Sequence, residues 1–310
     1  MRPSDPLGTV PKGVGRLLGP PGYGPAVETY SRLEQANDNA ADFWLAQARV
    51  HDWQHLDRPG FTAVRCARTT TDAHRVVVTR PYGEPADLEK ELAELLRTWG
   101  TTRLCLEDPY GALDLARLGC VHGLGMAVMV REPGTLSSGV GGARGAGGAR
   151  ATGGAEPGAT PSLGGRWRYG NELTVDEACD GDLLASVERT VVEGFPVPAH
   201  QPVTRGGMLP ESLLGEPGIR AWLARVEGQD AGACLTYDNG GTVGVYWVAT
   251  LPAHRSRGVA RALLETALAA HPDRPATLVS TLLAEPLYRK LGFVEHGVTR
   301  WWGYPAASEA

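Results

Sequence analysis

A glycine- and alanine-rich segment near the middle of the chain sets the main constraint on its fold. Residues 134–165 contain twelve glycines and six alanines in 32 positions. Such a segment has few large apolar side chains to bury, which is typical of a flexible linker. It predicts two blocks of ordinary domain size, residues 26–133 and 166–305. Six prolines and six glycines in residues 1–25 predict a flexible tail, and residues 306–310 form a second, short tail.

The composition argues against several classes of protein. The 310 residues carry a formal net charge of −5, whereas general nucleic-acid binders usually have a basic excess. No apolar run approaches the 18 residues of a membrane span, and the N-terminus lacks the apolar core of a secretory signal. We therefore expect a cytoplasmic protein, monomeric or homodimeric, without nucleic-acid or membrane partners. The five scattered cysteines form no CxxC pair and predict a reduced, metal-free chain: Cys66, Cys105, Cys120, Cys179 and Cys234.

The second block has the clearer secondary-structure pattern. Leu183, Leu184 and Val187 predict a helix within residues 174–195. Three antiparallel strands are predicted between residues 220 and 252, with a break at Gly228 and a hairpin at Asn239-Gly240-Gly241. The remaining elements are a helix after residue 258, a strand at 276–281, a helix at 284–293 that Gly292 ends, and a closing strand at 294–304.

The end of the first block repeats this order of elements. Moving the second block back by 173 positions brings ATLVST onto RLCLED, residues 103–108, and LGF onto LGC, residues 118–120, without a gap. The helix RALLETALAA falls on LEKELAELLR, and GFTAVRCA and HRVVVTR are predicted strands. We interpret this as an internal repeat of one fold. Chance similarity between two helix-strand-helix segments is the alternative.

The stretch LPAHRSRGVARALLETAL, residues 251–268, places basic residues where a helix begins. The first turn of a helix has N–H groups without partners, and its dipole adds partial positive charge, so together they form an anion site. Gly258 lets a ligand approach the backbone closely, and Ala260 keeps side-chain bulk away. The amides of residues 256–261 could therefore grip a pyrophosphate. The alternative is a solvated turn without a ligand.

This stretch resembles the acyl-CoA loop of the GCN5-related N-acetyltransferase (GNAT) family. The resemblance is carried by Arg255-x-x-Gly258-x-Ala260 and by the later AEPLYRKLGFVEHG, and it covers residues 215–305. It implies an α/β (α+β) fold of two tandem acyl-CoA N-acyltransferase-like domains, each a mixed, mainly antiparallel sheet flanked by helices. It also implies acetyl-CoA as the cofactor and a set of cofactor-binding residues: Val248, Ala249, Thr250, Arg255, Ser256, Arg257, Gly258, Val259, Ala260, Arg261, Thr281 and Tyr288.

The resemblance further implies direct acetyl transfer to a primary amine in a ternary complex. The strands GVYWVAT and ATLVST would part to admit the pantetheine arm, and an N–H near Val248 would stabilise the oxyanion. Tyr288 would protonate the leaving thiolate, since a phenol is protonated at neutral pH. Two departures stand out: the central strand has no glutamate, and Thr281 stands where the family often has asparagine.

The general base and the acceptor site stay open in the sequence. Glu193, His200 and His254 are candidate bases, and a water chain is an equal alternative. Residues 193–210 and the final TRWWGY should build the acceptor pocket, to which four aromatic side chains could contribute: Phe195, Trp247, Trp301 and Trp302. The chain has no acidic cluster for a polycation, so we expect a small amine or an amino-acid-like metabolite as acceptor.

The first block lacks the features of a cofactor site. Its counterpart of HRSRGVA is PYGEPAD, residues 81–87, where Glu84 and Asp87 would repel a pyrophosphate and Pro85 removes a donor. Leu115 stands at the position of Tyr288. We therefore predict a degenerate copy that helps to shape the acceptor cleft. A non-catalytic acyl-CoA sensor, another acyl donor and a hydroxyl acceptor are the alternative functions.

Overall fold

The computed structural model describes residues 30–66, 74–100, 103–134, 166–169, 173–195 and 200–304. The predicted tails and nearly all of the predicted linker lie outside these residues. The described residues from Ser31 onward belong to one compact unit. We call residues 31–134 its N-terminal half and residues 166–304 its C-terminal half. Within the described residues, no helix is long and apolar enough to cross a membrane.

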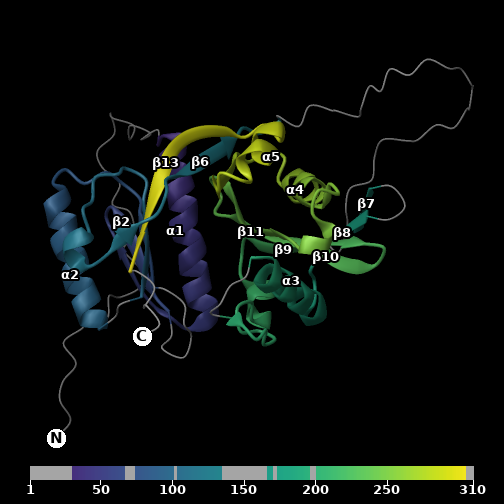
Figure 1. The fold of residues 1–310 in the computed structure, drawn as a ribbon, viewed down its shortest axis with the longest axis horizontal. Coiled ribbons are helices and arrows are strands. Elements are labelled where there is room, and N and C mark those ends of the chain that lie inside the picture. The colour runs from purple at the N-terminus through teal and green to yellow at the C-terminus, as the bar shows by residue number, and fades with distance from the viewer. Residues whose placement is uncertain are drawn as a thin grey trace, which may run out of the picture. The chain divides into compact units, whose positions relative to one another are not determined.

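Each half contains helices and strands in alternation (Figure 1). The N-terminal half consists of α1 (Arg32–His51), β1 (Gln54–Arg58), β2 (Phe61–Arg65), β3 (His74–Val78), α2 (Pro85–Trp99), β4 (Leu104–Asp108), the 3-10 turn η1 (Ala116–Leu118), β5 (Val121–His122) and β6 (Met126–Arg131). The C-terminal half consists of β7 (Arg166–Tyr169), β8 (Leu173–Glu177), α3 (Gly181–Gly194), η3 (Glu211–Gly215), β9 (Ile219–Val226), β10 (Gln229–Asp238), β11 (Val243–Thr250), η4 (Pro252–His254), α4 (Val259–Ala269), β12 (Ala276–Ser280), α5 (Glu285–Lys290) and β13 (Val294–Gly303).

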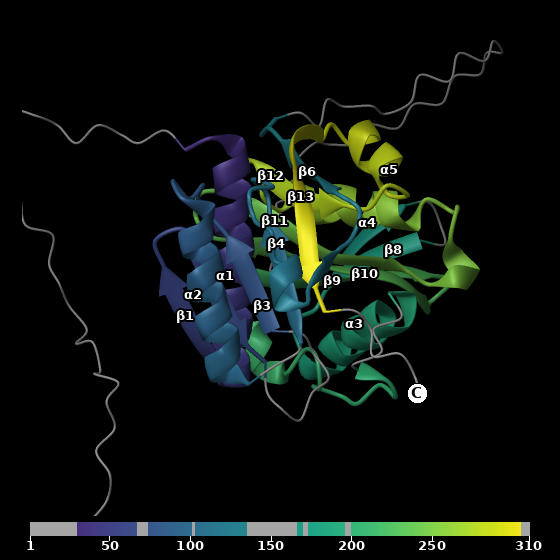
Figure 2. The ribbon, with the colours of Figure 1, turned by 60° about the vertical axis from the view of Figure 1, so that its left-hand side comes forward.

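One continuous sheet joins the two halves through an exchange of strands. Its order is β1-β2-β3-β4-β13-β6-β12-β11-β10-β9-β8-β7. β6, from the N-terminal half, lies between β12 and β13, and pairs antiparallel with both. β13, from the C-terminal half, continues past β6 and pairs antiparallel with β4 (Figures 1 and 2). Neither half therefore completes its part of the sheet with its own strands alone.

The sequence predicted most of these elements. The fold class is confirmed, since the sheet is mixed, mostly antiparallel and flanked by helices. The three strands β9, β10 and β11, the hairpin between the last two, and the helices α4 and α5 all lie where the pattern predicts them. From α1 and from α3 onward, both halves contain a helix, three strands, a second helix and a further strand, and the C-terminal half has β7 and β8 in addition. The tandem repeat itself stays a prediction. The strand exchange was not predicted, and the domain boundaries stay a prediction.

The helix predicted within residues 174–195 begins later than expected. Residues 173–177 form strand β8, which pairs antiparallel with β9 and buries Val175. The helix starts only after Asp180, whose carboxylate accepts hydrogen bonds from the N–H groups of Asp182 and Leu183. This N-cap separates strand from helix. The stretch TVDEACDGD therefore contains a strand end and a cap, and the helical pattern starts behind them.

The two faces of β4 have different neighbours because side chains alternate along a strand. Leu104 and Leu106 are buried in a core with Leu88, Leu92 and Leu96 of α2. The α2 leucines recur every four residues, which places them on one face of that helix. The alternate residues of β4 lie on the opposite face of the sheet. That face carries the polar residues on which the site depends.

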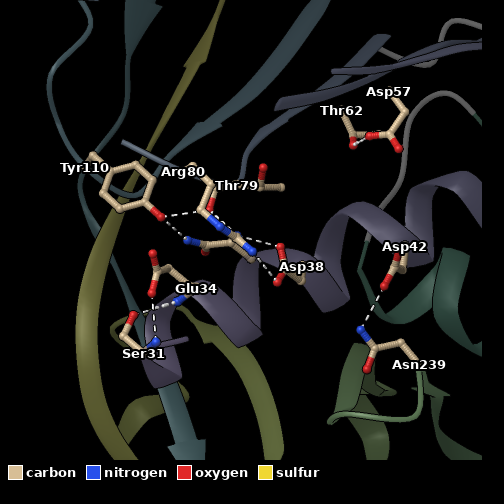
Figure 3. Close-up of polar contacts among 11 residues, drawn as sticks. Ser31, Glu34, Asp38, Asp42, Asp57, Thr62, Thr79, Arg80, Tyr110 and Asn239 are labelled. Carbon is tan, nitrogen blue, oxygen red and sulfur yellow. Dashed lines mark hydrogen bonds and ion pairs between the residues drawn. The ribbon is translucent and has the colours of Figure 1, made fainter. Parts of the chain in front are cut away.

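Helix α1, which the sequence analysis did not assign, contacts strands of both halves. A capping box of Ser31 and Glu34 starts it, and the sequence contains this signal as SRLE. Figure 3 shows how its polar side chains reach their neighbours, with an ion pair between Asp38 and Arg80 at 2.7 Å. Asn239 donates to the Asp42 carboxylate at 2.8 Å and so ties the β10–β11 hairpin to α1.

Asn39 makes the most buried of the α1 contacts. Its amide donates to the carbonyl oxygens of Tyr237 and Thr242 at 3.1 and 3.0 Å. Its carbonyl oxygen accepts from the Tyr246 hydroxyl at 2.7 Å. The Asn39 side chain is fully buried. It therefore satisfies three polar groups of the C-terminal half from a helix of the N-terminal half.

We expect Asn39→Ala to lower the free energy of unfolding by about 2–4 kcal/mol, because it removes three buried hydrogen bonds, to the Tyr237 and Thr242 carbonyl oxygens and from the Tyr246 hydroxyl. Urea unfolding followed by tryptophan fluorescence measures this loss. Lys90→Ala, on the exposed face of α2, is the control and should change the stability by less than about 0.5 kcal/mol. Equal stabilities of the two variants would show that Asn39 does not hold the halves together.

Candidate active site

The N-terminus of α4 presents a row of backbone donors. Gly258 caps the helix in the left-handed region, with a φ of 79°, and no side chain caps the first turn. No described residue offers an acceptor to the N–H groups of residues 256–261. A Cβ on Gly258 would meet nothing within 4 Å, so the space beside it is open. The predicted anion cradle therefore has the donors and the space that a diphosphate needs.

The arginines of this loop have different surroundings. Arg255 donates from Nε to the carbonyl oxygen of Thr250 at 3.2 Å, which joins the loop to the end of β11. Arg261 pairs with Glu265 one helical turn later, at 2.7 Å. Arg257 is exposed. The backbone at Ser256 also lies in the left-handed region, with a φ of 60°. The loop therefore holds its donors through backbone shape, with arginine charge at its rim.

Strands β11 and β12 part beside this loop. They pair in parallel only at their first residues, Val243 with Ala276 and Gly244 with Thr277. The corresponding strands of the N-terminal half, β3 and β4, stay paired over four residues, from His74 to Val77. The predicted opening between strands is thus found in the C-terminal half. The N-terminal half keeps its strands together at the equivalent place.

A β-bulge distorts β11 where it turns away. The register with β10 shifts between Ala233 and Leu235, so two residues of β11, Trp247 and Val248, face one residue of β10. Trp247 has a φ of 50°, a strained conformation for a large side chain. Bulges free backbone groups from the ladder and often lie beside active sites. This bulge lies at Val248, the residue whose N–H was predicted to meet the oxyanion.

Tyr288 lies on α5 and is almost fully buried. Its ring meets Phe293 edge-on, with centroids 5.9 Å apart, and packs in the core below β12. Burial raises the pKa of the Tyr288 phenol, and the nearby Cys234 thiol raises it further. The phenol therefore keeps its proton through the neutral range. Thr281 follows β12 directly and is exposed, and its carbonyl oxygen accepts the N–H groups of Ala284 and Glu285 that begin α5.

A cavity of about 350 Å³ lies between α1, the exchanged strands and the open end of β11. Both halves contribute to it. Its aromatic lining comes from Trp44, Trp53, Phe195, Tyr246, Trp247 and Trp301. Its polar and charged lining comes from Asn37, Gln47, His51, Arg75, Glu107, His200, Thr277, Thr281 and Thr299. It therefore combines aromatic walls with a few polar groups, as small-molecule sites usually do. We call it the acceptor cavity.

Glu107 is the single acid among the residues that line the acceptor cavity. It lies on β4 opposite Trp301 of β13, on the face that points away from α2. Burial raises the pKa of its carboxyl to about 7, while the Arg75 guanidinium and a hydrogen bond with the Trp44 side chain lower it. Arg75 itself lies over the Trp44 ring at 4.3 Å and donates to the Cys105 sulfur at 2.9 Å. A carboxyl of this pKa can change its charge near neutral pH.

The structure places the predicted acceptor residues at different sites. Phe195, Trp247, Trp301 and His200 line the acceptor cavity. Trp302 faces the other way, into the core beneath α2, because it is the neighbour of Trp301 on a strand. Glu193 is exposed near the end of α3 and is not among the lining residues, so its role as a base stays a prediction. His254 lies on η4, and its buried Nδ1 has no hydrogen-bond partner among the described residues.

Two parts of the cavity lining, Glu107 and the residues of α1, were not predicted from the sequence. The local pattern RLCLED predicts a strand, but which strand of the other half lies beside it depends on the exchange. The helix signal SRLE precedes residues 36, 37, 40, 44, 47 and 51, which line the cavity at helical spacing. That periodicity could have identified α1. No pattern in the sequence around either residue indicates that Trp44 of α1 contacts Glu107.

Comparison with known proteins supports the reading of the C-terminal half. The model of the acetyltransferase (GNAT) domain matches residues 217–295. A GCN5-related N-acetyltransferase from Kribbella flavida is similar over 87% of this chain and 97% of its own, with 16% identity and a TM-score of 0.56. One from Sphaerobacter thermophilus covers 87% of this chain and 92% of its own, with 16% identity and a TM-score of 0.50. These likenesses show the fold. No curated protein matches the chain.

The buried carboxyl of Glu107 should make stability depend on pH. Its pKa rises from 4.5 when unfolded to about 7 when folded, so the folded state binds more protons between these values. Raising the pH through this window should therefore destabilise the wild type relative to Glu107→Gln, by on the order of 3 kcal/mol. Urea unfolding at several pH values measures the difference. A difference between Glu107→Gln and the wild type that does not vary with pH would refute the assignment.

Proposed function

We propose that the chain is an N-acyltransferase that transfers an acetyl group from acetyl-CoA to a primary amine. The match of residues 217–295 to the acetyltransferase (GNAT) domain supports this proposal. The acceptor is a small molecule or an amino-acid-like metabolite, and both substrates are bound at the same time. The observation that carries this proposal is the row of unpartnered N–H groups at Gly258, directly beside the opening between β11 and β12.

The residues present fit the donor substrate. The backbone N–H groups of residues 256–261 would hold the diphosphate. The backbone groups of Val248, Ala249 and Thr250, at the end of β11, would form hydrogen bonds with the amides of the pantetheine arm. When bound, acetyl-CoA supplies the activated acetyl thioester. The acceptor cavity reaches the same opening, since Val245 and Trp247 of β11 and Leu278 and Val279 of β12 are part of its lining. An amine in the cavity can thus reach a thioester between the strands.

Two groups of the chain would act on the reacting atoms. The N–H at the Val248 bulge would stabilise negative charge on the thioester oxygen while the C–N bond forms. Tyr288 would donate its proton to the sulfur as the C–S bond breaks. Its buried position keeps that proton in place at neutral pH, since burial raises the pKa of the phenol. Glu193, His200 and a water chain stay proposals for the base that accepts the amine proton.

We propose one cofactor site per chain, in the C-terminal half. At the equivalent place in the N-terminal half, Glu84 caps α2 and Pro85 occupies its first turn. A carboxylate and a missing N–H both disfavour a diphosphate there. The continued pairing of β3 with β4 leaves no opening for a pantetheine arm. The cytoplasmic location, the oligomeric state and the absence of nucleic-acid partners stay predictions.

Gly258→Trp should abolish acetyl-CoA binding, because a large side chain would fill the space in front of the donors. We expect an increase in Kd of at least about 100-fold, equal to the loss of roughly 3 kcal/mol. Isothermal titration with CoA measures it, and circular dichroism checks the fold. The control is Gly83→Trp, at an open glycine before α2, which should leave Kd unchanged. Unchanged affinity in Gly258→Trp would place the cofactor elsewhere.

Tyr288→Phe should lower kcat by about 10- to 100-fold, because it removes the proton donor and little volume. The Kd for acetyl-CoA should stay within about twofold, since the predicted diphosphate contacts come from the backbone. Thiol release with an accepted amine gives kcat, and titration gives Kd. The control is Tyr82→Phe, which removes a hydroxyl from the N-terminal half. A kcat equal to wild type would remove Tyr288 from the chemistry.

A further inference from the structure

The acceptor cavity holds one buried carboxylate, which has the Arg75 guanidinium as a charged neighbour, among aromatic walls. Among its lining residues, Glu107 is the single acid, and Arg75, His51 and His200 are the basic or titratable neighbours. Glu107 comes from β4 of the N-terminal half, whereas the predicted cofactor loop belongs to the C-terminal half. The exchange of β13 brings the two together, since Trp301 pairs with Glu107 on β4 while the first part of β13 pairs with β6.

We propose that Glu107 binds the amine of the acceptor and takes its proton, and that the acceptor is a monoamine with an aromatic or apolar body. This inference rests on the proposed function and assigns its acceptor class. The N-terminal half, although degenerate as a cofactor site, then supplies a catalytic residue. That role explains why a carboxylate is kept on a buried strand face where an uncharged residue would be less costly.

Glu107 and Tyr288 together account for every proton that moves in the reaction. The ammonium of the acceptor gives one proton to the Glu107 carboxylate and becomes a neutral amine. The amine nitrogen forms the C–N bond, the C–S bond breaks, and the sulfur takes the proton of Tyr288. The second proton leaves the nitrogen and restores the Tyr288 phenol, directly or through water. Glu107 then returns its proton to solvent, and the products are an amide and free thiol.

The charge and polarity of the cavity select the acceptor. A single carboxylate can neutralise one ammonium, so a polyamine would bring further charges without partners into a largely apolar site. The rings of Trp44, Trp247 and Trp301 provide flat apolar walls, and a cation can also lie against such rings. Three polar atoms of lining residues have no hydrogen-bond partner among the described residues: Gln47 Nε2, Thr299 Oγ1 and Trp301 Nε1. These three groups can donate hydrogen bonds, so they favour an acceptor substrate whose apolar part also carries an oxygen atom.

The titration of Glu107 agrees with this role. A base works best when its pKa lies near the working pH, and burial raises the pKa of Glu107 to about 7. The groups that interact with it are Arg75 on β3, Cys105 on its own strand, Trp44 on α1 and Tyr246 on β11. His51 of α1 and His200 after α3 line the same cavity. Arg75 is the permanent cation among them, and it opposes the rise. A second positive charge, on the bound acceptor, would lower the pKa of the carboxyl further, so that Glu107 meets the ammonium as a carboxylate.

The test compares Glu107→Gln with wild type in the full chain. The probes are 2-phenylethylamine, tyramine and phenylalanine amide, with spermidine as the polyamine and acetyl-CoA as donor. We expect wild type to favour at least one aromatic monoamine over spermidine by at least about tenfold in kcat/KM. Glu107→Gln should lose about 100-fold or more in kcat/KM for that amine, with an unchanged Kd for CoA. The rise of kcat/KM with pH near neutrality should disappear in this variant.

Matched variants separate this role from a structural one. Glu227→Gln removes an exposed carboxylate in the turn between β9 and β10 and should leave both kcat/KM and its pH profile unchanged. Glu107→Asp keeps the carboxylate and should restore part of the rate. If an amine is transferred equally well by wild type and Glu107→Gln, or if spermidine is preferred, the inference is overturned while the proposed function stands. It is also overturned if no aromatic monoamine reacts with or binds the CoA-loaded protein. If wild type binds no CoA, the proposed function itself fails.

Discussion

The exchange of β6 and β13 is the constraint on which the rest of the structure depends. Each strand completes the part of the sheet built by the other half. Because backbone hydrogen bonds are then shared between halves, the two cannot separate without exposing strand edges. The exchange also fixes α1 against strands of both halves, with Asn39 as its most buried polar contact. The acceptor cavity is the space that this arrangement encloses.

The two halves share part of their order of elements and differ at the places where a cofactor site is proposed. In the C-terminal half a bulge at Trp247 and an early end to the pairing of β11 with β12 open the sheet beside the helix start at Gly258. In the N-terminal half the equivalent strands stay paired, and Glu84 and Pro85 begin the helix. The C-terminal half thus has the features of the proposed anion site and an opening between strands, and the N-terminal half lacks the corresponding features. If Glu107 takes part in the reaction as proposed, the N-terminal half has a role beyond packing against the C-terminal half.

Features that depend on neighbours in sequence could be predicted, and features that depend on neighbours in space could not. The loop at 255–261, the hairpin at Asn239-Gly240-Gly241 and the helix stop at Gly292 follow from local backbone preferences. The strand exchange depends on the pairing of β6 and β13 with strands that are far from them in the sequence, and local residue patterns do not specify such pairs. Glu107 and Trp302 illustrate the consequence: each sits on a predicted strand, but only the assembled sheet decides which of its faces meets the cavity.

The number of CoA molecules bound per chain tests the account most directly. The backbone donors of the proposed cofactor site and the opening between β11 and β12 both lie in the C-terminal half. Titration of the full chain with CoA should therefore saturate at one molecule per chain. Saturation at two would show that the N-terminal half keeps a working site, and the absence of binding would contradict the assignment of the Gly258 loop.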